Sequence, residues 1–361
     1  MPSFWRNTYS PLPTNHVQGQ QRRRISPGLA ILTIAACTVL LWAGRQFLAS
    51  KKYSPLTDYQ ELNAPSLLGG PSAPREQRAV VSTLYSDSYA IGVAVLGHSV
   101  RHANVTARLV LPYLEGRVSD EALCVVRAVG WEPLAVPFIP PPHNGEGIYY
   151  RFYDQYTKLN IWGLDAHGIT QAVYLDADTL AMQNFDELFE LPFTFAAVPD
   201  IYGDARGFTV DFNAGVLVLR PAARVLAAMK AALEVAKYPL AQAEQSFLNL
   251  FFGASTLRLP YAYNANLAIK RSAPAMWAGM RDEIRIVHYT LTKPFIDDHA
   301  EQGTPRVLDE GHLRQVLEQA ATAEGGLFAE EVGWWSDAYD RMMSEARTKI
   351  KDCQYSHGAW R

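Results

Sequence analysis

The chain has 361 residues, of which 48% are hydrophobic and 11% aromatic, and its formal net charge is −3. A chain of this length can bury a large core, as one catalytic domain with appendages or as two domains. Its weakly negative charge excludes the general attraction to polyanions on which nucleic-acid-binding proteins depend, so we expect no nucleic-acid partner.

Near the N-terminus, residues 25–44 predict a membrane span. This segment lies between Arg24 and Arg45, contains no charged residue and is long enough for a bilayer-crossing helix of about 20 residues. A cleaved signal peptide, processed near Leu48-Ala49-Ser50, is the alternative. The long, proline-containing leader favours the anchor.

The basic residues around this span predict its orientation. Arg22, Arg23 and Arg24 precede it, whereas Lys51 and Lys52 follow it, so the positive-inside signal is weak. We predict a cytosolic tail at residues 1–24 and a luminal catalytic domain, in a single-pass type II protein of the Golgi membrane.

The chain after the span divides by composition. Residues 45–78 are rich in proline, serine and glycine and predict a stem. We place the folded domain at residues 79–300 and a helical extension at 301–361. Asn104 begins an N-glycosylation sequon, which has meaning only in a lumen.

Within the folded domain, apolar runs alternate with amphipathic segments. In chain order we predict a strand at 79–84, a helix at 89–102, a strand at 107–113, a helix at 120–129, a strand at 132–139, a helix at 152–164 and a strand at 172–175. This order predicts an α/β fold with a mostly parallel sheet covered on both faces. The glycine-rich dinucleotide and phosphate-loop motifs are absent, which argues against a dehydrogenase or a P-loop enzyme.

An acidic pair follows the strand predicted at 172–175. Asp176 and Asp178 flank Ala177, where the ligand crevice of an open α/β sheet lies. Two carboxylates there can hold a hard cation that neutralises phosphate charge. The alternative is a solvated turn without a ligand.

Three cysteines, Cys37, Cys124 and Cys353, are too few for a disulfide framework. Cys37 lies in the apolar run, so a bridge could join only Cys124 to Cys353; two unrelated core thiols are the alternative. We also expect Trp334 and Trp335, in the helical extension, to be core or interface residues and not sugar-stacking ones.

Several segments carry a family resemblance in their order and spacing. They are STLYSDSYAIGVAVLGHSV, YTKLNIWGL, VYLDADTLAMQNFDELFEL, FNAGVLVLRP, AEQSFLNLFF and RIVHYTLTKPF. Together they resemble the glycogenin-like retaining glycosyltransferases of family eight, which include galactinol synthase. The resemblance implies a GT-A (Rossmann-like) fold, a UDP-sugar donor and Mn²⁺, with Mg²⁺ as the alternative metal.

The resemblance also assigns roles to individual residues. It implies metal binding by Asp176, Asp178 and His288. It implies donor binding by a larger set: Thr83, Leu84, Tyr89, Lys158, Asp176, Ala177, Asn213, Ala214, Gly215 and Lys293. The catalytic candidates are Lys158, Asp200, Glu244 and Gln245. Glu244 stands where many relatives carry aspartate, although the galactinol synthase branch shares the glutamate.

The chemistry explains why such residue types are needed. Cleaving a sugar–phosphate bond builds negative charge on the diphosphate and positive charge on the sugar, so each end needs a preorganised partner. A divalent cation and Lys293 suit the diphosphate, whereas Asp200, Glu244 and Gln245 suit the sugar. Retention through a covalent intermediate and same-face attack both remain open, and we favour same-face attack because an amide is a poor nucleophile.

We therefore predict a retaining hexosyltransferase acting on a glycan, glycolipid or polyol acceptor; a homodimer is left open. Transfer to inositol, as by galactinol synthase, is one alternative, and a non-catalytic scaffold with a nucleotide-sugar fold is another. A dehalogenase-like phosphatase, with Asp297 and Asp298 as its second acidic pair, is disfavoured because about three βα units precede the DAD motif.

Overall fold

The computed structural model describes residues 35–39, 73–201, 207–296 and 306–357. Residues 35–39 are helical and belong to the unit Met1–Tyr53, separate from the unit Ser54–Arg361. The rest of the predicted tail, span and stem up to residue 72 lies outside the described residues, as does the pair Asp297-Asp298. Within the described part of the chain, no helix has the length and apolar character that a membrane crossing requires. The span therefore stays a prediction.

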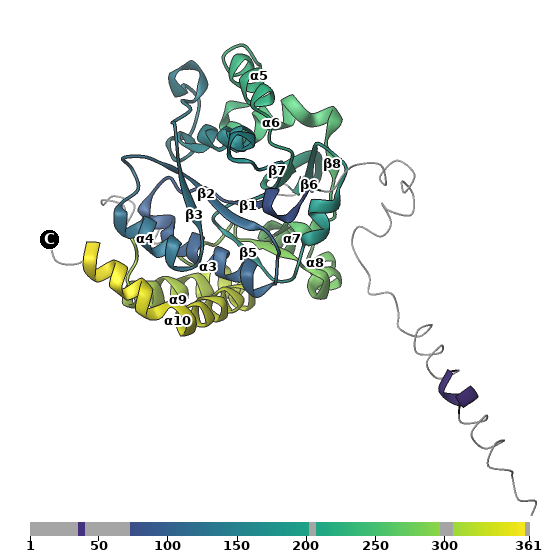
Figure 1. Ribbon diagram of the computed structural model, residues 1–361, viewed down its shortest axis with the longest axis vertical. Coiled ribbons are helices and arrows are strands. Elements are labelled where there is room, and N and C mark those ends of the chain that lie inside the picture. Colours follow the sequence, from purple (N-terminus) through teal and green to yellow (C-terminus); the bar gives the residue numbers. More distant parts are fainter. Residues whose placement is uncertain (1–34, 40–72, 202–206, 297–305, 358–361) are drawn as a thin grey trace, which may run out of the picture. The chain divides into compact units, whose positions relative to one another are not determined.

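A seven-stranded sheet forms the centre of the larger unit (Figure 1). Its order is β3-β2-β1-β4-β7-β6-β8. The strands are β1 Arg78–Val81, β2 Arg108–Leu114, β3 Glu132–Val136, β4 Gln171–Leu175, β6 Phe195–Ile201, β7 Phe208–Leu219 and β8 Leu257–Arg258. Four neighbouring strands run parallel to one another, namely β3, β2, β1 and β4. Strand β8 also runs parallel to its neighbour β6. Strand β7, which lies between β4 and β6, is antiparallel to both. The predicted mostly parallel sheet is confirmed, with antiparallel strands in one half.

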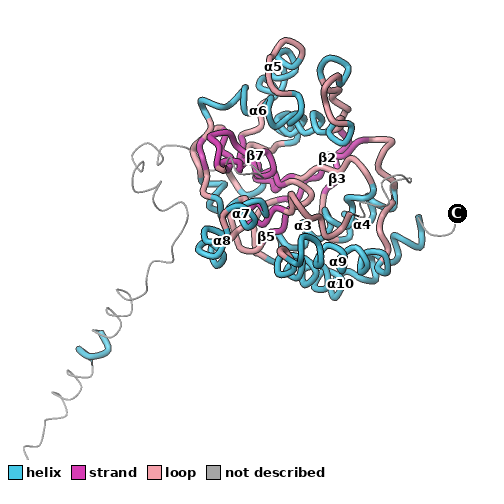
Figure 2. Tube along the Cα trace, turned by 180° about the vertical axis from the view of Figure 1, so that it is seen from behind, coloured by secondary structure: helices cyan, strands magenta, loops and turns pink. Residues whose placement is uncertain are grey.

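The sheet is buried on both faces because its strands alternate apolar side chains between two cores. Val80 packs on one side, while Ala79 and Val81 pack on the other. The first face carries α3 Ala90–His102 and α4 Asp120–Ala128, and the second carries α5 Ala223–Leu233 and α6 Ala243–Phe252. Figure 2 shows these helices on opposite sides of the strands.

The segment before β4 differs from the α-helix predicted at 152–164. The chain forms a short 3-10 turn at Tyr150–Phe152 and a longer 3-10 helix at Gln155–His167. A 3-10 helix has three residues per turn, so side chains three apart share a face. Tyr156, Leu159 and Trp162 accordingly pack together in the core under the sheet, which leaves Lys158 on another face.

A second, three-stranded sheet positions the candidate site. It consists of β5 Thr179–Ala181, β10 Ile286–His288 and β9 Ala265–Asn266, in the order β5-β10-β9. His288 pairs with Thr179 in antiparallel register. Because Thr179 directly follows Asp178, this register brings the end of β10 beside the acidic pair.

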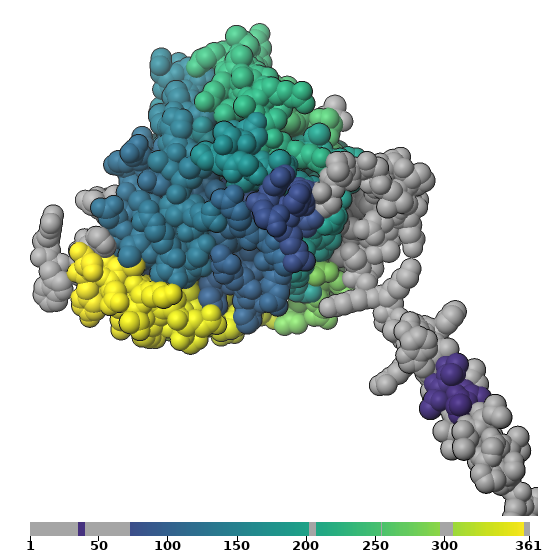
Figure 3. Space-filling view, in the orientation of Figure 1, coloured from purple at the N-terminus to yellow at the C-terminus, as the bar shows by residue number. Residues whose placement is uncertain are grey.

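Two C-terminal helices cover the α3 and α4 side of the main sheet. They are α9 Glu310–Gly326, which is kinked at 323–325, and α10 Ala329–His357. In the space-filling view their yellow surface lies against the blue surface of the preceding helices (Figure 3). The remaining short helices, α7 Leu267–Ser272 and α8 Pro274–Met280, lie between β9 and β10 in the chain. The predicted C-terminal helices are therefore present: α10 packs on α3 and α4, and α9 packs on α10.

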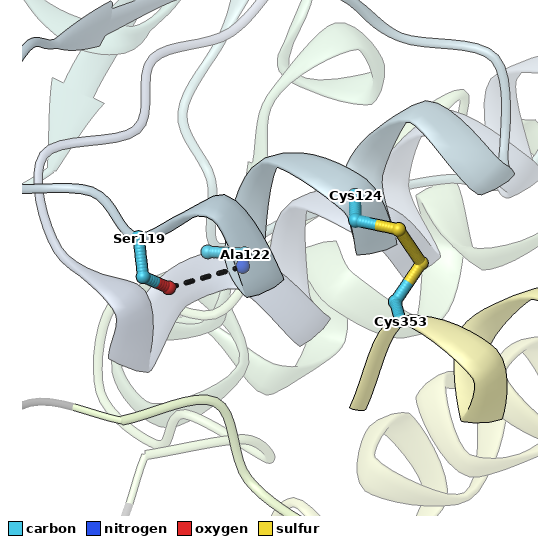
Figure 4. Close-up of a disulfide and its surroundings, with 4 residues drawn as sticks. All are labelled: Ser119, Ala122, Cys124 and Cys353. Atoms are coloured by element: carbon cyan, nitrogen blue, oxygen red, sulfur yellow. Dashed lines mark hydrogen bonds between the residues drawn. A yellow bond between two sulfur atoms is a disulfide. The ribbon is translucent and has the colours of Figure 1, made fainter. Parts of the chain in front are cut away.

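A disulfide joins Cys124 in α4 to Cys353 in α10 (Figure 4). The sequence left this bridge open, because residues 229 apart in the chain carry no sign of proximity. Cys37 is a free, exposed cysteine. Trp335 is fully buried and stacks on Phe295 and Tyr339, which confirms a core role for this residue. Trp334 is half-buried, with the Arg281 guanidinium over its ring.

Candidate active site

The acidic pair lies at the end of β4, as the sequence predicts. The backbone N–H of Asp176 donates to the Gly215 carbonyl at 2.8 Å, which ties the turn to β7. Thr179 closes the turn by donating its backbone N–H to the Asp176 carbonyl at 3.0 Å. Asp176 and Ala177 are half-buried and Asp178 is 8% exposed. Both carboxylates are thereby presented at the carboxyl end of a buried strand.

His288 completes a cluster of three cation-binding groups. Its Nε2 lies 3.2 Å from Asp178 Oδ1 and 3.9 Å from Asp176 Oδ2. The ligand atoms of the three residues all lie within 4.8 Å of one another. The structure therefore brings together the three residues to which the sequence resemblance assigns the metal.

The orientation of the His288 ring fits a role as ligand. Asn264 donates its side-chain N–H to Asn213 Oδ1 at 2.9 Å, so its own carbonyl oxygen faces His288 Nδ1 at 3.0 Å. That oxygen can only accept, so Nδ1 carries a proton and the other ring nitrogen, Nε2, is the atom turned toward the two carboxylates, where a cation would bind. Asn264 is 1% exposed. Sequence reasoning missed it, because no motif surrounds it and 24 residues separate it from His288.

Lys158 lies beneath the acidic pair. Its ammonium is 3.0 Å from Asp176 Oδ1 and donates to Glu244 Oε1 at 2.7 Å. Burial lowers the pKa of Lys158, but the two carboxylates outweigh burial and hold the pKa above its ordinary value. Lys158 is therefore a fixed positive charge between Asp176 and Glu244.

Tyr174 is a second residue that sequence reasoning missed. Its hydroxyl donates to Asp176 Oδ1 at 2.6 Å and accepts from the Thr83 hydroxyl at 3.1 Å. Burial, followed by the nearby Asp176 charge, raises the pKa of Tyr174 well above its ordinary value, so the phenol stays a donor. The i, i+2 spacing of Tyr174 and Asp176 on a strand was the available signal, because such residues share a face.

Lys293 lies against the other carboxylate. Its ammonium donates to Asp178 Oδ2 and, at 3.4 Å, to the Tyr289 carbonyl. Burial tends to raise the pKa of Asp178, but Lys293 and His288 outweigh it and hold that pKa well below its usual value. The structure thus places the predicted diphosphate lysine directly at the candidate metal cluster.

Of the three residues assigned to the sugar end, Asp200 and Gln245 belong to one hydrogen-bonded network, whereas Glu244 is paired with Lys158. Gln245 donates to Asp200 Oδ2 at 2.8 Å and accepts from the Ala214 N–H at 3.0 Å. Asn213 donates to Asp200 Oδ1 at 3.2 Å and accepts from the Gly215 N–H at 2.9 Å. Burial raises the pKa of the Asp200 carboxyl despite these donors.

The three residues predicted to bind the nucleoside, Thr83, Leu84 and Tyr89, differ in burial and in contacts. Thr83 is 7% exposed and belongs to the Tyr174 chain of hydrogen bonds. Leu84 is fully buried, and its N–H and carbonyl pair with β2 through Pro112 and Leu114. Tyr89 is half-buried, and its ring packs edge-to-face with that of Phe295, with centroids 5.7 Å apart. Leu84 has the fewest free groups of the three with which to contact a ligand. The base-binding roles of all three residues stay predictions.

At the strand ends of this mixed α/β sheet, the carboxylates of Asp176 and Asp178 and the imidazole of His288 form a candidate cation and diphosphate site. The chain belongs to glycosyl transferase family 8: the model of that family matches residues 80–298, more than half of the chain.

Several glycosyltransferases and glycogenins are similar to this chain in sequence. Glycogenin of Neurospora crassa is 26% identical over 275 residues, covering 75% of this chain and 36% of that protein. Inositol phosphorylceramide glucuronosyltransferase 1 of Arabidopsis thaliana is 27% identical over 273 residues, covering 69% and 48%. Galactinol synthase 1 of Solanum lycopersicum is 34% identical over 163 residues, covering 40% and 49%. The chain thus spans about a third to a half of the length of these relatives.

Solved structures include two glycosyltransferases of low similarity. The bifunctional glycosyltransferase WbbM aligns with a TM-score of 0.48 at 19% identity, over 76% of this chain and 53% of that one. The galactosyltransferase LgtC, in complex with donor and acceptor sugar analogues, aligns with a TM-score of 0.44 at 19% identity, over 68% and 95%.

Proposed function

We propose that this chain is a retaining glycosyltransferase that uses Mn²⁺ to transfer a hexosyl group from a UDP-sugar to a glycan, glycolipid or polyol acceptor. The observation that carries the proposal is the convergence of Asp176, Asp178 and His288 within 4.8 Å at the end of β4. Membership of glycosyl transferase family 8 supports it. Two carboxylates and one imidazole suit Mn²⁺ somewhat better than Mg²⁺.

The residues around the cluster divide the work of bond cleavage. A bound divalent cation supplies Lewis acidity to the leaving diphosphate. Lys293, at the edge of the cluster, adds a positive charge for the same group. Lys158 and Tyr174 hold Asp176, while Asn264 holds His288. These supporting contacts fix the ligands before donor binds, which limits reorganisation during the reaction.

The sugar end favours same-face attack over a covalent intermediate. Asp200 accepts hydrogen bonds from the Ile201 N–H, Asn213 and Gln245, which occupy both of its oxygens. The Gln245 amide is itself engaged at both ends. Groups that are held in this way are suited to orient and stabilise charge, and less suited to act as nucleophiles.

The test is turnover and donor binding across UDP-, GDP- and ADP-sugars with Mn²⁺ or EDTA. We expect Mn²⁺-dependent turnover of one UDP-sugar by the wild-type protein. Asp178→Asn removes a ligand charge, so it is expected to lower turnover by more than about 100-fold and to abolish metal-dependent donor binding. Asp337→Asn, an exposed aspartate on α10, is the matched control.

Either of two results contradicts this proposal. Undiminished turnover by Asp178→Asn removes the metal site from the mechanism. Absence of binding to every nucleotide sugar, by a wild-type protein that is folded, favours a non-catalytic scaffold instead.

Inositol belongs in the acceptor panel as a second candidate. The specific observation in its favour is the 34% identity over 163 residues to a galactinol synthase, higher than that to the glycogenins and the glucuronosyltransferase compared with it. Transfer to myo-inositol at a rate above that to glycan acceptors would identify a polyol transferase.

We also propose that the catalytic unit lies in the Golgi lumen behind the predicted span at residues 25–44. The Cys124–Cys353 disulfide supports this placement, because such bridges persist in oxidising compartments. Asn104 of the sequon is exposed, as luminal glycosylation requires. In sealed vesicles from cells that make the protein, added protease is expected to spare the catalytic unit, and Asn104 to carry a glycan. Digestion of that unit in intact vesicles would place it in the cytosol.

A further inference from the structure

Each carboxylate of the metal cluster holds a lysine ammonium in this structure. Lys158 lies 3.0 Å from Asp176 Oδ1, and Lys293 donates to Asp178 Oδ2. A carboxylate that faces an ammonium has part of its cation-binding capacity already used. The two lysines therefore bear directly on how strongly the cluster attracts a divalent cation.

Lys158 is held in place whether or not Asp176 changes partner. Its side chain is 1% exposed, and it has a second carboxylate partner in Glu244 at 2.7 Å. The Ala214 carbonyl and the face of the Tyr174 ring complete its surroundings. A cation on Asp176 would leave Lys158 paired with Glu244, so no buried charge would be stranded.

Lys293 is placed differently. Its side chain is 29% exposed, and it lies in the irregular segment between β10 and Phe295. Among the described residues, its hydrogen-bond acceptors are Asp178 and, at 3.4 Å, the Tyr289 carbonyl. A lysine side chain is long and flexible, so this ammonium can leave Asp178 for another anion nearby.

We propose that Lys293 acts as a resident counter-ion of Asp178, which competes with the metal until a diphosphate draws the ammonium away. The inference rests on the metal site of the proposed function. Its consequence is that metal and nucleotide bind cooperatively: the cluster binds Mn²⁺ weakly alone and tightly with UDP. By linkage, Mn²⁺ and UDP raise each other's affinity by the same factor.

The test measures Mn²⁺ dissociation constants of the full chain by free-Mn²⁺ electron paramagnetic resonance, with and without UDP. Lys293→Met keeps the length of the side chain and removes its charge. We expect it to tighten Mn²⁺ binding without UDP by at least about fivefold and to reduce the factor by which UDP improves that binding. Lys293→Arg keeps the charge, so its Mn²⁺ affinity without UDP is expected to stay as weak as that of the wild type.

Lys230→Met, on the exposed side of α5, is the matched control and is expected to leave both constants unchanged. Thermal unfolding confirms that each variant is folded, and Lys293→Gln replaces Lys293→Met if the latter is not. Folded, charge-removing variants whose Mn²⁺ affinity equals that of the wild type would overturn the counter-ion role. No Mn²⁺ binding by any variant, even with UDP, would instead overturn the metal site of the proposed function and this inference with it.

Discussion

At the scale of single residues, the candidate site depends on one close approach. Gly215 lies in β7 against His288, and a Cβ built on it would be 2.2 Å from the ring Cε1 and 2.9 Å from Asn213 Oδ1. Its backbone lies outside the positive-φ set of glycines. The glycine is therefore required for space and not for conformation, since any larger residue would displace the imidazole.

We expect Gly215→Ala to weaken Mn²⁺ binding by displacing His288, and to destabilise the fold by about 1–3 kcal/mol through overpacking. Calorimetric titration with Mn²⁺ and urea unfolding measure the two effects. Gly279→Ala, on α8, is the matched control, because a Cβ there meets nothing within 4 Å. Equal Mn²⁺ affinity in Gly215→Ala and the wild type would show that His288 is not a ligand.

At the scale of elements, the C-terminal helices support the segment that carries Lys293. Phe295 stacks on Trp335 of α10 with ring centroids 5.7 Å apart and contacts the edge of Tyr89 at the same distance. A Cβ on Gly92 of α3 would be 2.5 Å from the Phe295 ring, so the ring fits tightly against that helix. Lys293 is thus attached to a segment that Phe295 anchors.

The N-terminus of α9 depends on Asp309, whose Oδ1 accepts the His312 N–H at 2.9 Å. Burial tends to raise the pKa of Asp309, but the His312 N–H and ring outweigh it, so the pKa is lowered. A lowered carboxyl pKa contributes stability above the unfolded pKa of about 3.9, and that stability is lost as pH falls below it.

Asp309→Ala is therefore expected to reduce the free energy of unfolding by about 1 kcal/mol at pH 7 and by less at pH 3. Urea unfolding at both pH values measures the difference. Asp309→Asn retains a capping oxygen without the charge, so it is expected to remain closer to the wild type at pH 7 and to show no such pH trend. An equal loss for Asp309→Ala at both pH values would contradict the charge contribution.

At the scale of the whole unit, α10 closes the fold through contacts between distant parts of the chain. The fully buried Glu331 accepts from Lys270 of α7 at 2.7 Å and 2.8 Å. The disulfide between Cys124 and Cys353 closes a loop of 229 residues, which by the loop-entropy model stabilises the fold by about 5 kcal/mol. The late part of the chain is therefore integral to the unit and not an independent appendage.

The sequence by itself determined most of the alternating strands and helices, and it predicted the end of β4, with its acidic pair, as the candidate site. These features depend on local periodicity and on ordered motifs, both of which are written in neighbouring residues. The helix predicted at 152–164 was wrong in type, because the 3-10 winding of Gln155–His167 follows from how Tyr156, Leu159 and Trp162 pack in the core.

Only the tertiary structure decided which distant groups meet. The register of β10 on β5 sets His288 beside Asp178, and the packing of β7 leaves just enough room at Gly215 for the imidazole. The partners Tyr174 and Asn264, and the ammonium of Lys293 on Asp178, likewise follow from three-dimensional contact. Such contacts depend on strand register and core packing over long separations, which no local pattern in one sequence records.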